Sequence, residues 1–320
     1  MDERDISTAV ELGQFRHRAD PSTPDADLSE KPTKIRIPHE RTCSCPSNRI
    51  SCVDAKTWMK CQLGVWQFYY EARDIRKKDV HPAMFPIALA RRWIDLLSHE
   101  GELVLDPFVG TGTTLVAARD ARRNAVGFDL HPGYIHLAGE RLSQRSLFDG
   151  TVQIAIHEDA RRIAEHLGPE TVSLIVTSPP YANLLNRPRK NKSRRSDQRR
   201  NSQYLKVEQY STDPRDLGIM ALDEYAAAMA GIFAGLLPLL RPGAHCIIDV
   251  PDMWWEDSRM TIHVALIEAL RHVGYEFRNT VIWDRTNIVN RVGIFGWPNN
   301  YITMGTTFEY LLDFRRPLVG

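Results

Sequence analysis

The feature that most constrains the fold is a regular alternation of short apolar segments and helical segments that begins near residue 86. Strand-like apolar segments occur at 102–106, 125–129, 152–156 and 173–177. Helical periodicity is expected at 87–97, 114–122 and 132–143. Strands that alternate with helices at this spacing build a parallel sheet covered on both faces, because each parallel connection needs a crossover. The sequence therefore predicts an α/β fold.

The C-terminal half continues this pattern after an interruption at 183–217, which we expect to be a loop. The elements predicted there are a helix at 222–239, a turn at 241–243, a strand at 244–250, a helix at 260–272, and strands at 277–283 and 308–314. Together these segments predict one large domain over residues 81–320.

The N-terminal quarter differs from the rest in composition. Residues 1–40 are polar and contain four prolines, which predicts a flexible arm, and residues 41–80 form a cysteine- and aromatic-bearing segment. The first residues lack the basic and apolar regions of a signal peptide, and no apolar run approaches the roughly 18–20 residues of a membrane span. We therefore expect a soluble cytoplasmic protein with no membrane partner.

A glycine turn joins the first strand to the following helix, in the sequence Asp106-Pro-Phe-Val-Gly-Thr-Gly-Thr-Thr114. Its two glycines allow a tight turn and close approach of a ligand, and the helix N-terminus offers free N–H groups to a carboxylate. A phosphate loop would need a Lys after the glycines, and a dinucleotide fingerprint would need a small residue where Leu115 stands. The turn therefore predicts a different ligand.

Acidic residues follow three successive strands and indicate what that ligand is. Asp106 can accept from an ammonium group, Asp129 can hold ribose hydroxyls, and Asp159 can accept from an adenine amino group. Ammonium, carboxylate, ribose and adenine together describe S-adenosylmethionine. The sequence therefore predicts this molecule as the cofactor.

The segment Thr177-Ser-Pro-Pro-Tyr181 ends the fourth strand and predicts a second site. The Ser178 hydroxyl and the Pro179 carbonyl can both accept hydrogen bonds from one amino group, and Tyr181 offers a flat ring for stacking on a base. Two acceptors on an exocyclic amine favour its pyramidal form, which frees the nitrogen lone pair to attack a methyl sulfonium. This pattern indicates methyl transfer to the amino group of a base.

The glycine turn and the Ser-Pro-Pro-Tyr segment together resemble the amino-group DNA methyltransferases, specifically the branch that acts on cytosine N4. The resemblance extends over about residues 78–315 and includes a further cofactor motif at 81–86 and a late strand at 307–314. It implies a Rossmann-like class I methyltransferase sheet that is mostly parallel, with an antiparallel late strand and helices on both faces. It also implies site-specific methylation of double-stranded DNA, in which the target base flips out of the helix.

The resemblance assigns roles to individual residues. The implied catalytic residues are Ser178, Pro179, Pro180 and Tyr181. The implied cofactor-binding residues are His81, Pro82, Phe85, Asp106, Pro107, Phe108, Gly110, Gly112, Thr113, Thr114, Asp129 and Asp159. Two departures stand out: the cofactor motifs precede the catalytic motif, and no segment after residue 315 is long enough for a target-recognition domain.

A strongly basic stretch directly after the catalytic motif predicts contact with DNA phosphates. Its basic residues, opposed by Asp197 alone, are Arg187, Arg189, Lys190, Lys192, Arg194, Arg195, Arg199 and Arg200. The sequence does not fix the recognition sequence, the presence of a restriction endonuclease as partner, or the choice between monomer and homodimer.

Alternatives to cytosine N4 remain at this stage. Ser178 favours cytosine over adenine N6, but adenine enzymes share the chemistry, and an RNA substrate or a catalytically idle DNA-binding module also stays open. C5-cytosine chemistry is rejected because the sequence contains no Pro-Cys nucleophile motif.

Five cysteines, an odd number, argue against a disulfide framework. Cys43, Cys45, Cys52 and Cys61 contain only one close pair, whereas zinc sites usually show two Cys-x2–4-Cys pairs. We therefore expect free thiols and no metal ligands.

Overall fold

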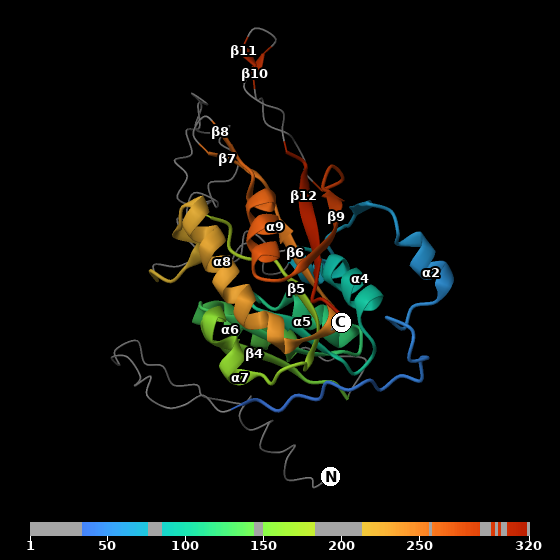
Figure 1. Cartoon of the computed structure of the whole chain (residues 1–320). Helices are drawn as coiled ribbons and strands as arrows, with labels where there is room; N and C mark the ends of the chain where they lie inside the picture. Colours follow the sequence, from blue (N-terminus) through green and yellow to red (C-terminus); the bar gives the residue numbers. More distant parts are fainter. Residues whose placement is uncertain are drawn as a thin grey trace.

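The computed structural model describes residues 34–75, 85–143, 150–182, 213–255, 258–288, 296–297, 300–301 and 306–318 (Figure 1). Its centre is an eight-stranded sheet with the strand order β1-β9-β12-β6-β5-β2-β3-β4. In that order the strands span Val65–Gln67, Glu276–Asp284, Phe308–Arg315, Leu240–Val250, Val172–Thr177, Leu103–Asp106, Asn124–Asp129 and Gln153–His157.

Strand direction in this sheet is parallel at every pairing except those of β12. β12 runs antiparallel to both of its neighbours, β6 and β9, while β2 pairs in parallel with both β3 and β5. The prediction of a Rossmann-like sheet that is mostly parallel, with an antiparallel late strand, is confirmed.

Two layers of helices cover the sheet, because alternate residues of each strand point to opposite faces. Leu103 and Leu105 pack with the side chains of α8 and α9, whereas Val104 packs with those of α4 and α5. The principal helices are α4 (Ile87–Leu97), α5 (Thr113–Asp120), α6 (Pro132–Leu142), α7 (Ile163–His166), α8 (Leu222–Leu236) and α9 (Ile262–His272). Helices on both faces were expected, and the two clusters of buried side chains confirm them.

The smaller elements lie at the rim of this arrangement. They are α2 (Ala55–Lys60), α3 (Ala72–Ile75), two hairpin-like pairs, β7 (Met253–Trp255) with β8 (Ser258–Met260) and β10 (Gly296–Trp297) with β11 (Asn300–Tyr301), and the 3-10 turns η1 (Ala160–Arg162), η3 (Leu217–Ile219) and η4 (Leu237–Leu239).

The predicted turn at 241–243 is wrong, because β6 runs through it from Leu240 to Val250. The pairing of β5 with β6 shifts register between Val172, opposite Leu240, and Leu174, opposite His245. Gly243 adopts φ 77°, a conformation that glycine reaches without steric cost. The Arg-Pro-Gly segment therefore forms an irregularity inside a long strand, of the kind that bulges produce.

The segment that precedes the main domain contributes to its sheet. β1 is only three residues long, and it adds a parallel edge strand beside β9. Trp66 in β1 is buried, with its ring 4.7 Å from that of Trp93 in α4. Of the predicted arm, residues 1–33 lie outside the described part, whereas Ile37 is buried in the core and the Ile35 amide donates to the carbonyl of His166.

One helical stretch is long and apolar enough to span a membrane by length and composition. It comprises Leu222–Leu239, with a mean hydropathy of 1.3, and it corrects the expectation that no run of this length exists. Tyr225, Met229 and Phe233 on this helix are fully buried in the core. Packing within the domain therefore buries one part of this stretch.

Candidate active site

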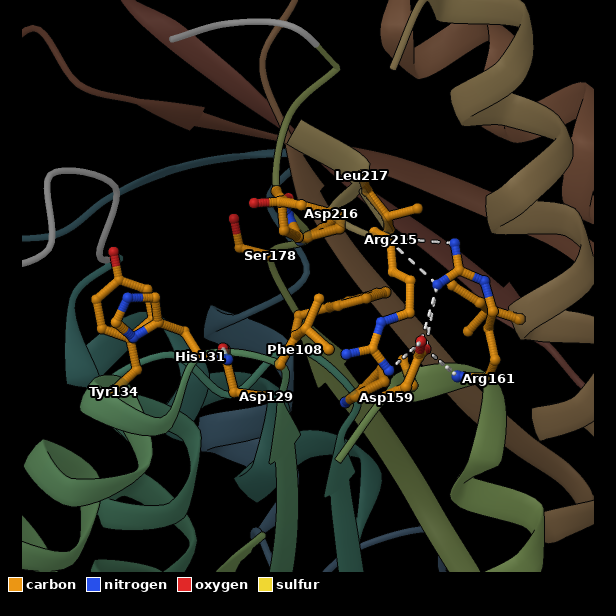
Figure 2. A pocket seen from close by; sticks show the side chains of 16 residues that line it. Phe108, Asp129, His131, Tyr134, Asp159, Arg161, Ser178, Arg215, Asp216 and Leu217 are labelled. Atoms are coloured by element: carbon orange, nitrogen blue, oxygen red, sulfur yellow. Dashed lines mark hydrogen bonds and ion pairs between the residues drawn. The ribbon is translucent and has the colours of Figure 1, made fainter. Parts of the chain in front are cut away.

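An open pocket of about 710 Å³ lies at the carboxyl ends of the central strands (Figure 2). It sits beside the point where the strand order reverses between β2 and β5, which is where ligands bind in open α/β sheets. The lining residues are Pro107, Phe108, Asp129, Leu130, His131, Tyr134, Asp159, Ala160, Arg161, Ser178, Pro179, Pro180, Arg215, Asp216, Leu217 and Ile232.

The glycine turn is held by a dense set of backbone contacts. The Gly110 amide donates to Asp129 Oδ2 at 2.9 Å, and the Val109 amide donates to the carbonyl of Phe128 at 2.8 Å. Arg141 of α6 donates to the carbonyl of Thr111 at 2.9 Å. The turn is thus fixed to β3 and α6, so that its shape does not depend on a ligand.

Gly112 is required both by its conformation and by its packing. Its φ is 84°, and a Cβ placed there would lie 2.9 Å from the Cβ of Ala138 in α6. We expect Gly112→Ala to lower the free energy of unfolding by about 1–3 kcal/mol, as measured by urea denaturation. Gly139→Ala in α6 is the control, since a Cβ there meets nothing within 4 Å, and it should raise stability by about 0.5–1 kcal/mol. Equal effects of the two substitutions would contradict this account of the turn.

Asp106 lies beneath the pocket and is absent from its lining. Its Oδ1 accepts from Thr177 Oγ1 at 2.6 Å and from the Phe108 amide at 3.0 Å. Its Oδ2 accepts from Thr114 Oγ1 at 2.6 Å. Burial raises the pKa of this carboxyl to about 6. The structure therefore shows Asp106 tying the glycine turn to the end of β5, where the sequence suggested a contact with the cofactor.

Asp129 lines the pocket at the end of β3. Its two oxygens accept from the amides of His131, at 2.8 Å, and Gly110, at 2.9 Å. Burial raises its pKa to about 7, while these amide hydrogen bonds oppose the rise. Each oxygen retains a further lone pair for a ligand hydroxyl.

Asp159 also lines the pocket, but it already has cationic partners. Arg161 lies 3.1 Å from Oδ2, and Arg215 lies 3.9 Å from the same oxygen (Figure 2). Arg161 also donates to the carbonyl of Arg215 at 3.3 Å, which links η1 to the segment before η3. The sequence predicted neither arginine. Arg215 lies more than fifty residues along the chain from Asp159, so its proximity depends on the fold.

A hydrogen-bonded chain leads from Ser178 at the pocket wall into the sheet. The hydroxyl groups of Ser178 and Tyr181 are 2.9 Å apart, and Tyr181 hydrogen-bonds to the buried carboxylate of Glu309. Either hydroxyl can be the donor in this pair, and in both cases the Ser178 oxygen keeps a lone pair for a further donor. The Ser178 oxygen is then left as an acceptor.

Glu309 is a residue that sequence reasoning did not include. It lies on β12, pairs with Arg285 and is beside Asp249 of β6. Burial raises the pKa of Glu309 and raises that of Asp249 well above its ordinary value, with Arg285 opposing both rises. The signal in the sequence was a charged residue inside the apolar run 308–314, which is unusual for a buried strand.

Other predicted residues lie away from the pocket or outside the described part. Phe85 is buried among the side chains of the α4 and α5 layer, and Gly110, Gly112, Thr113 and Thr114 form the turn beneath the pocket. His81, Pro82 and the basic residues between Arg187 and Arg200 lie outside the described residues. Pro107, Phe108, Pro179 and Pro180 line the pocket as expected, and their roles stay predictions.

Similarity to known proteins covers part of the chain. Residues 28–140 match a family described as DNA methylase, whose name denotes N6 and N4 methyltransferases. The Type II methyltransferase M.BglI of Bacillus subtilis is 35% identical over 118 residues, which are 37% of this chain and 30% of that protein. M.HpaI of Haemophilus parainfluenzae is 40% identical over 86 residues, 27% of each chain. The matches thus span less than a third of these relatives' lengths.

Similarity to solved structures is more distant. TrmN from Thermus thermophilus aligns with a TM-score of 0.45 and 18% identity, over 75% of this chain and 52% of that one. A DNA modification methylase from the same organism aligns with a TM-score of 0.33 and 20% identity, over 51% of this chain and 53% of that one. By its sequence matches, this chain is similar to the amino-group DNA methyltransferases, and the family model matches residues 28–140.

Proposed function

We propose that this protein transfers a methyl group from S-adenosylmethionine to the exocyclic N4 of a cytosine flipped out of double-stranded DNA. The observation that carries the proposal is the position of Ser178. Its oxygen is an acceptor at the wall of a pocket whose other side is lined by Asp129 and Phe108. A substrate amine and a methyl donor can therefore meet in one pocket.

The pocket residues fit the parts of S-adenosylmethionine. Asp129 can accept from both ribose hydroxyls, and Phe108, Leu217 and Ile232 form an apolar wall for the adenine ring. Arg161 donates to Asp159 Oδ2 at 3.1 Å and Arg215 stands at 3.9 Å, so this oxygen keeps a lone pair for an adenine amino group. When bound, this cofactor supplies an electrophilic methyl group on a positively charged sulfur.

The residues of this chain prepare the nucleophile. A cytosine amine that donates to Ser178 and to the Pro179 carbonyl becomes more pyramidal, and its lone pair becomes available for attack. Positive charge develops on this nitrogen in the transition state, so acceptors that are already oriented stabilise it most there. Tyr181 was predicted to stack on the base, but it is buried and outside the pocket lining, so we propose that Tyr181 and Glu309 hold Ser178 in the accepting orientation. Loss of one amine proton afterwards restores the neutral amine.

DNA contact is assigned to the basic stretch that contains Arg194 and Arg195, which follows the catalytic segment directly in the sequence. Neutralisation of several phosphates would give binding a steep dependence on salt. We also propose that a restriction endonuclease accompanies the enzyme, because the relatives that match are Type II methyltransferases.

The affinity for S-adenosylmethionine should rise with pH up to about 7. Burial raises the pKa of the Asp129 carboxyl to about 7, and ribose hydroxyls that donate to the carboxylate lower it again. Binding therefore releases a proton below pH 7, and the affinity levels off above that value. Calorimetric titrations between pH 5 and pH 8.5 measure this slope.

Asp129→Asn is the control for this titration, because it keeps the shape of the side chain and removes its charge. The variant should bind S-adenosylmethionine more weakly and should lose the part of the slope near pH 7. A pH profile identical in wild type and variant would contradict the role of Asp129.

The proposed function is tested with purified protein, S-adenosylmethionine bearing a deuterated methyl group, and mixed-sequence DNA or RNA. Nucleosides from each reaction are analysed by mass spectrometry. Labelled N4-methylcytosine from DNA alone supports the proposal. Labelled N6-methyladenine would overturn the choice of base, label in RNA alone would overturn the choice of nucleic acid, and cofactor binding without any product on either would indicate an idle binding module.

A further inference from the structure

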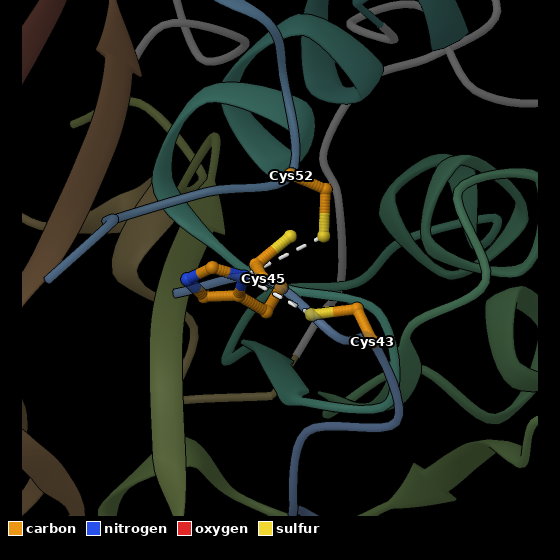
Figure 3. Close-up of side chains that lie close together, drawn as sticks. Cys43, Cys45 and Cys52 are labelled. Atoms are coloured by element: carbon orange, nitrogen blue, oxygen red, sulfur yellow. Dashed lines mark hydrogen bonds between the residues drawn. The ribbon is translucent and has the colours of Figure 1, made fainter. Parts of the chain in front are cut away.

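Three cysteines of one short segment and a histidine from another segment lie close together (Figure 3). Cys43, Cys45 and Cys52 precede α2, whereas His99 lies between α4 and β2. One ligand atom from each of the four lies within 4.8 Å of all the others. Cys43 Sγ is 3.3 Å and Cys52 Sγ is 3.5 Å from His99 Nδ1.

We propose that Cys43, Cys45, Cys52 and His99 bind one Zn²⁺ ion as a structural site. Zinc–sulfur and zinc–nitrogen bonds of about 2.3 Å and 2.0 Å place the sulfur and nitrogen ligands of a tetrahedron about 3.5 Å apart. The two sulfur–nitrogen separations match that edge. Three thiolates and one imidazole are also a ligand set that zinc prefers.

The imidazole of His99 is already oriented as a ligand. Its Nε2 lies 2.9 Å from the carbonyl of Arg49, which can only accept, so Nε2 carries the proton. Nδ1 is therefore the unprotonated nitrogen, and it is the one that faces the sulfurs. A histidine that ligates zinc through one nitrogen and donates to a carbonyl through the other is the usual arrangement. The ring is also buried, at 1% exposure, so that its orientation is fixed.

Hydrogen bonds outside the ligand set support the same geometry. The amide of Glu100 donates to Cys52 Sγ at 3.4 Å, as amides do to metal-bound sulfur. The amide of Thr42 donates to the carbonyl of Glu100 at 2.8 Å, so the backbone beside Cys43 is fixed to the loop that carries His99. A disulfide between two of the cysteines would explain neither why the third thiol lies beside them nor why the His99 ring turns its Nδ1 toward the sulfurs.

The position of the site indicates a structural role. His99 precedes β2, at the amino end of the strand whose carboxyl end forms the pocket. Four protein ligands fill a tetrahedral zinc, which leaves no position for substrate. The ion would fasten the segment that leads to α2 and β1 onto the loop before β2. It would thereby hold an edge strand of only three residues on the sheet.

Metal content provides the test, with Cys45→Ser as the variant and Cys61→Ser as the matched control. Cys61 is partly buried in the same segment and lies outside the cluster. Protein purified under reducing conditions is analysed for zinc by inductively coupled plasma mass spectrometry. We expect one zinc per chain in wild type and in Cys61→Ser, and substantially less in Cys45→Ser. Absence of zinc from the wild type, or equal zinc in all three proteins, would overturn the proposal.

A second measurement does not depend on how the variants fold. Wild-type protein is stripped with a chelator under reducing conditions and titrated with Co²⁺ alone. One equivalent should give the visible and near-ultraviolet absorption of tetrahedral cobalt with thiolate ligands, and Zn²⁺ should displace it. A spectrum of octahedral cobalt, or a mass two hydrogens lower that marks a disulfide in the reduced preparation, would also overturn the site.

Discussion

Ser178→Ala is expected to lower the rate constant of methyl transfer by about 100- to 1000-fold, which is the effect of removing one pre-oriented partner of a developing charge. The affinity for S-adenosylmethionine should stay close to that of the wild type, because Asp129 and the apolar wall are untouched. Single-turnover methylation of DNA measures the rate constant, and calorimetry measures the affinity. A variant that keeps the wild-type rate constant would remove Ser178 from the reaction.

Tyr181→Phe tests the orientation of the Ser178 hydroxyl separately from its presence, because the variant keeps this hydroxyl and removes its hydrogen-bond partner. Without the Tyr181 hydroxyl, Ser178 can turn and donate toward the substrate amine, where an acceptor is needed. The rate constant should fall by less than in Ser178→Ala, by about tenfold, the equivalent of one hydrogen bond of about 1.4 kcal/mol. A larger loss than that of Ser178→Ala would assign Tyr181 a direct role in contacting the base.

Asp106→Ala is expected to have the largest effect on stability, lowering the free energy of unfolding by about 3–5 kcal/mol. The substitution leaves the hydroxyls of Thr114 and Thr177 and the amide of Phe108 without their buried acceptor, at about 1–3 kcal/mol each when added without coupling. Urea denaturation measures the loss. Asp223→Ala is the control, because that acid is exposed in the first turn of α8 and should cost at most about 1 kcal/mol.

The loss of unfolding free energy caused by Asp106→Ala should also depend on pH. Burial raises the pKa of Asp106 from its ordinary 3.8 to about 6 in the folded protein. A carboxyl with a raised pKa stabilises the fold most below its unfolded pKa, and this contribution is lost as the pH rises through 6. The difference between wild type and variant should therefore be larger at pH 4 than at pH 7. A difference that grows with pH would show that the ionised form is the one the fold favours.

Local patterns were sufficient to predict most of the sheet. The strand–glycine turn–helix sequence around Gly110 and Gly112 gave the first βα unit, because a tight turn and apolar periodicity are encoded in adjacent residues. β1 was not predicted, since three residues carry too little pattern, and its pairing with β9 involves residues more than two hundred positions away. The Arg-Pro-Gly segment inside β6 has the local sequence of a turn, and the bulge that accommodates it in a strand depends on pairing with the distant β5.

The sequence was sufficient to predict those residues of the candidate site that lie at strand ends. Asp129 and Ser178 line the pocket because the carboxyl ends of parallel strands meet at one edge. Asp106 also stands at the end of a strand, but it lies outside the pocket lining because it accepts hydrogen bonds from the hydroxyls of Thr114 and Thr177. Glu309 and His99 come from distant segments, and single residues of this kind carry no local signal of their partners. Three-dimensional packing determines these contacts.

The measurement that tests the account most directly is nucleoside mass spectrometry of DNA from cells that lack other DNA methyltransferases and express this chain. We predict N4-methylcytosine in cells with the wild-type chain and its loss with Ser178→Ala expressed at the same level. N6-methyladenine in its place, or N4-methylcytosine that persists with Ser178→Ala, would contradict this prediction.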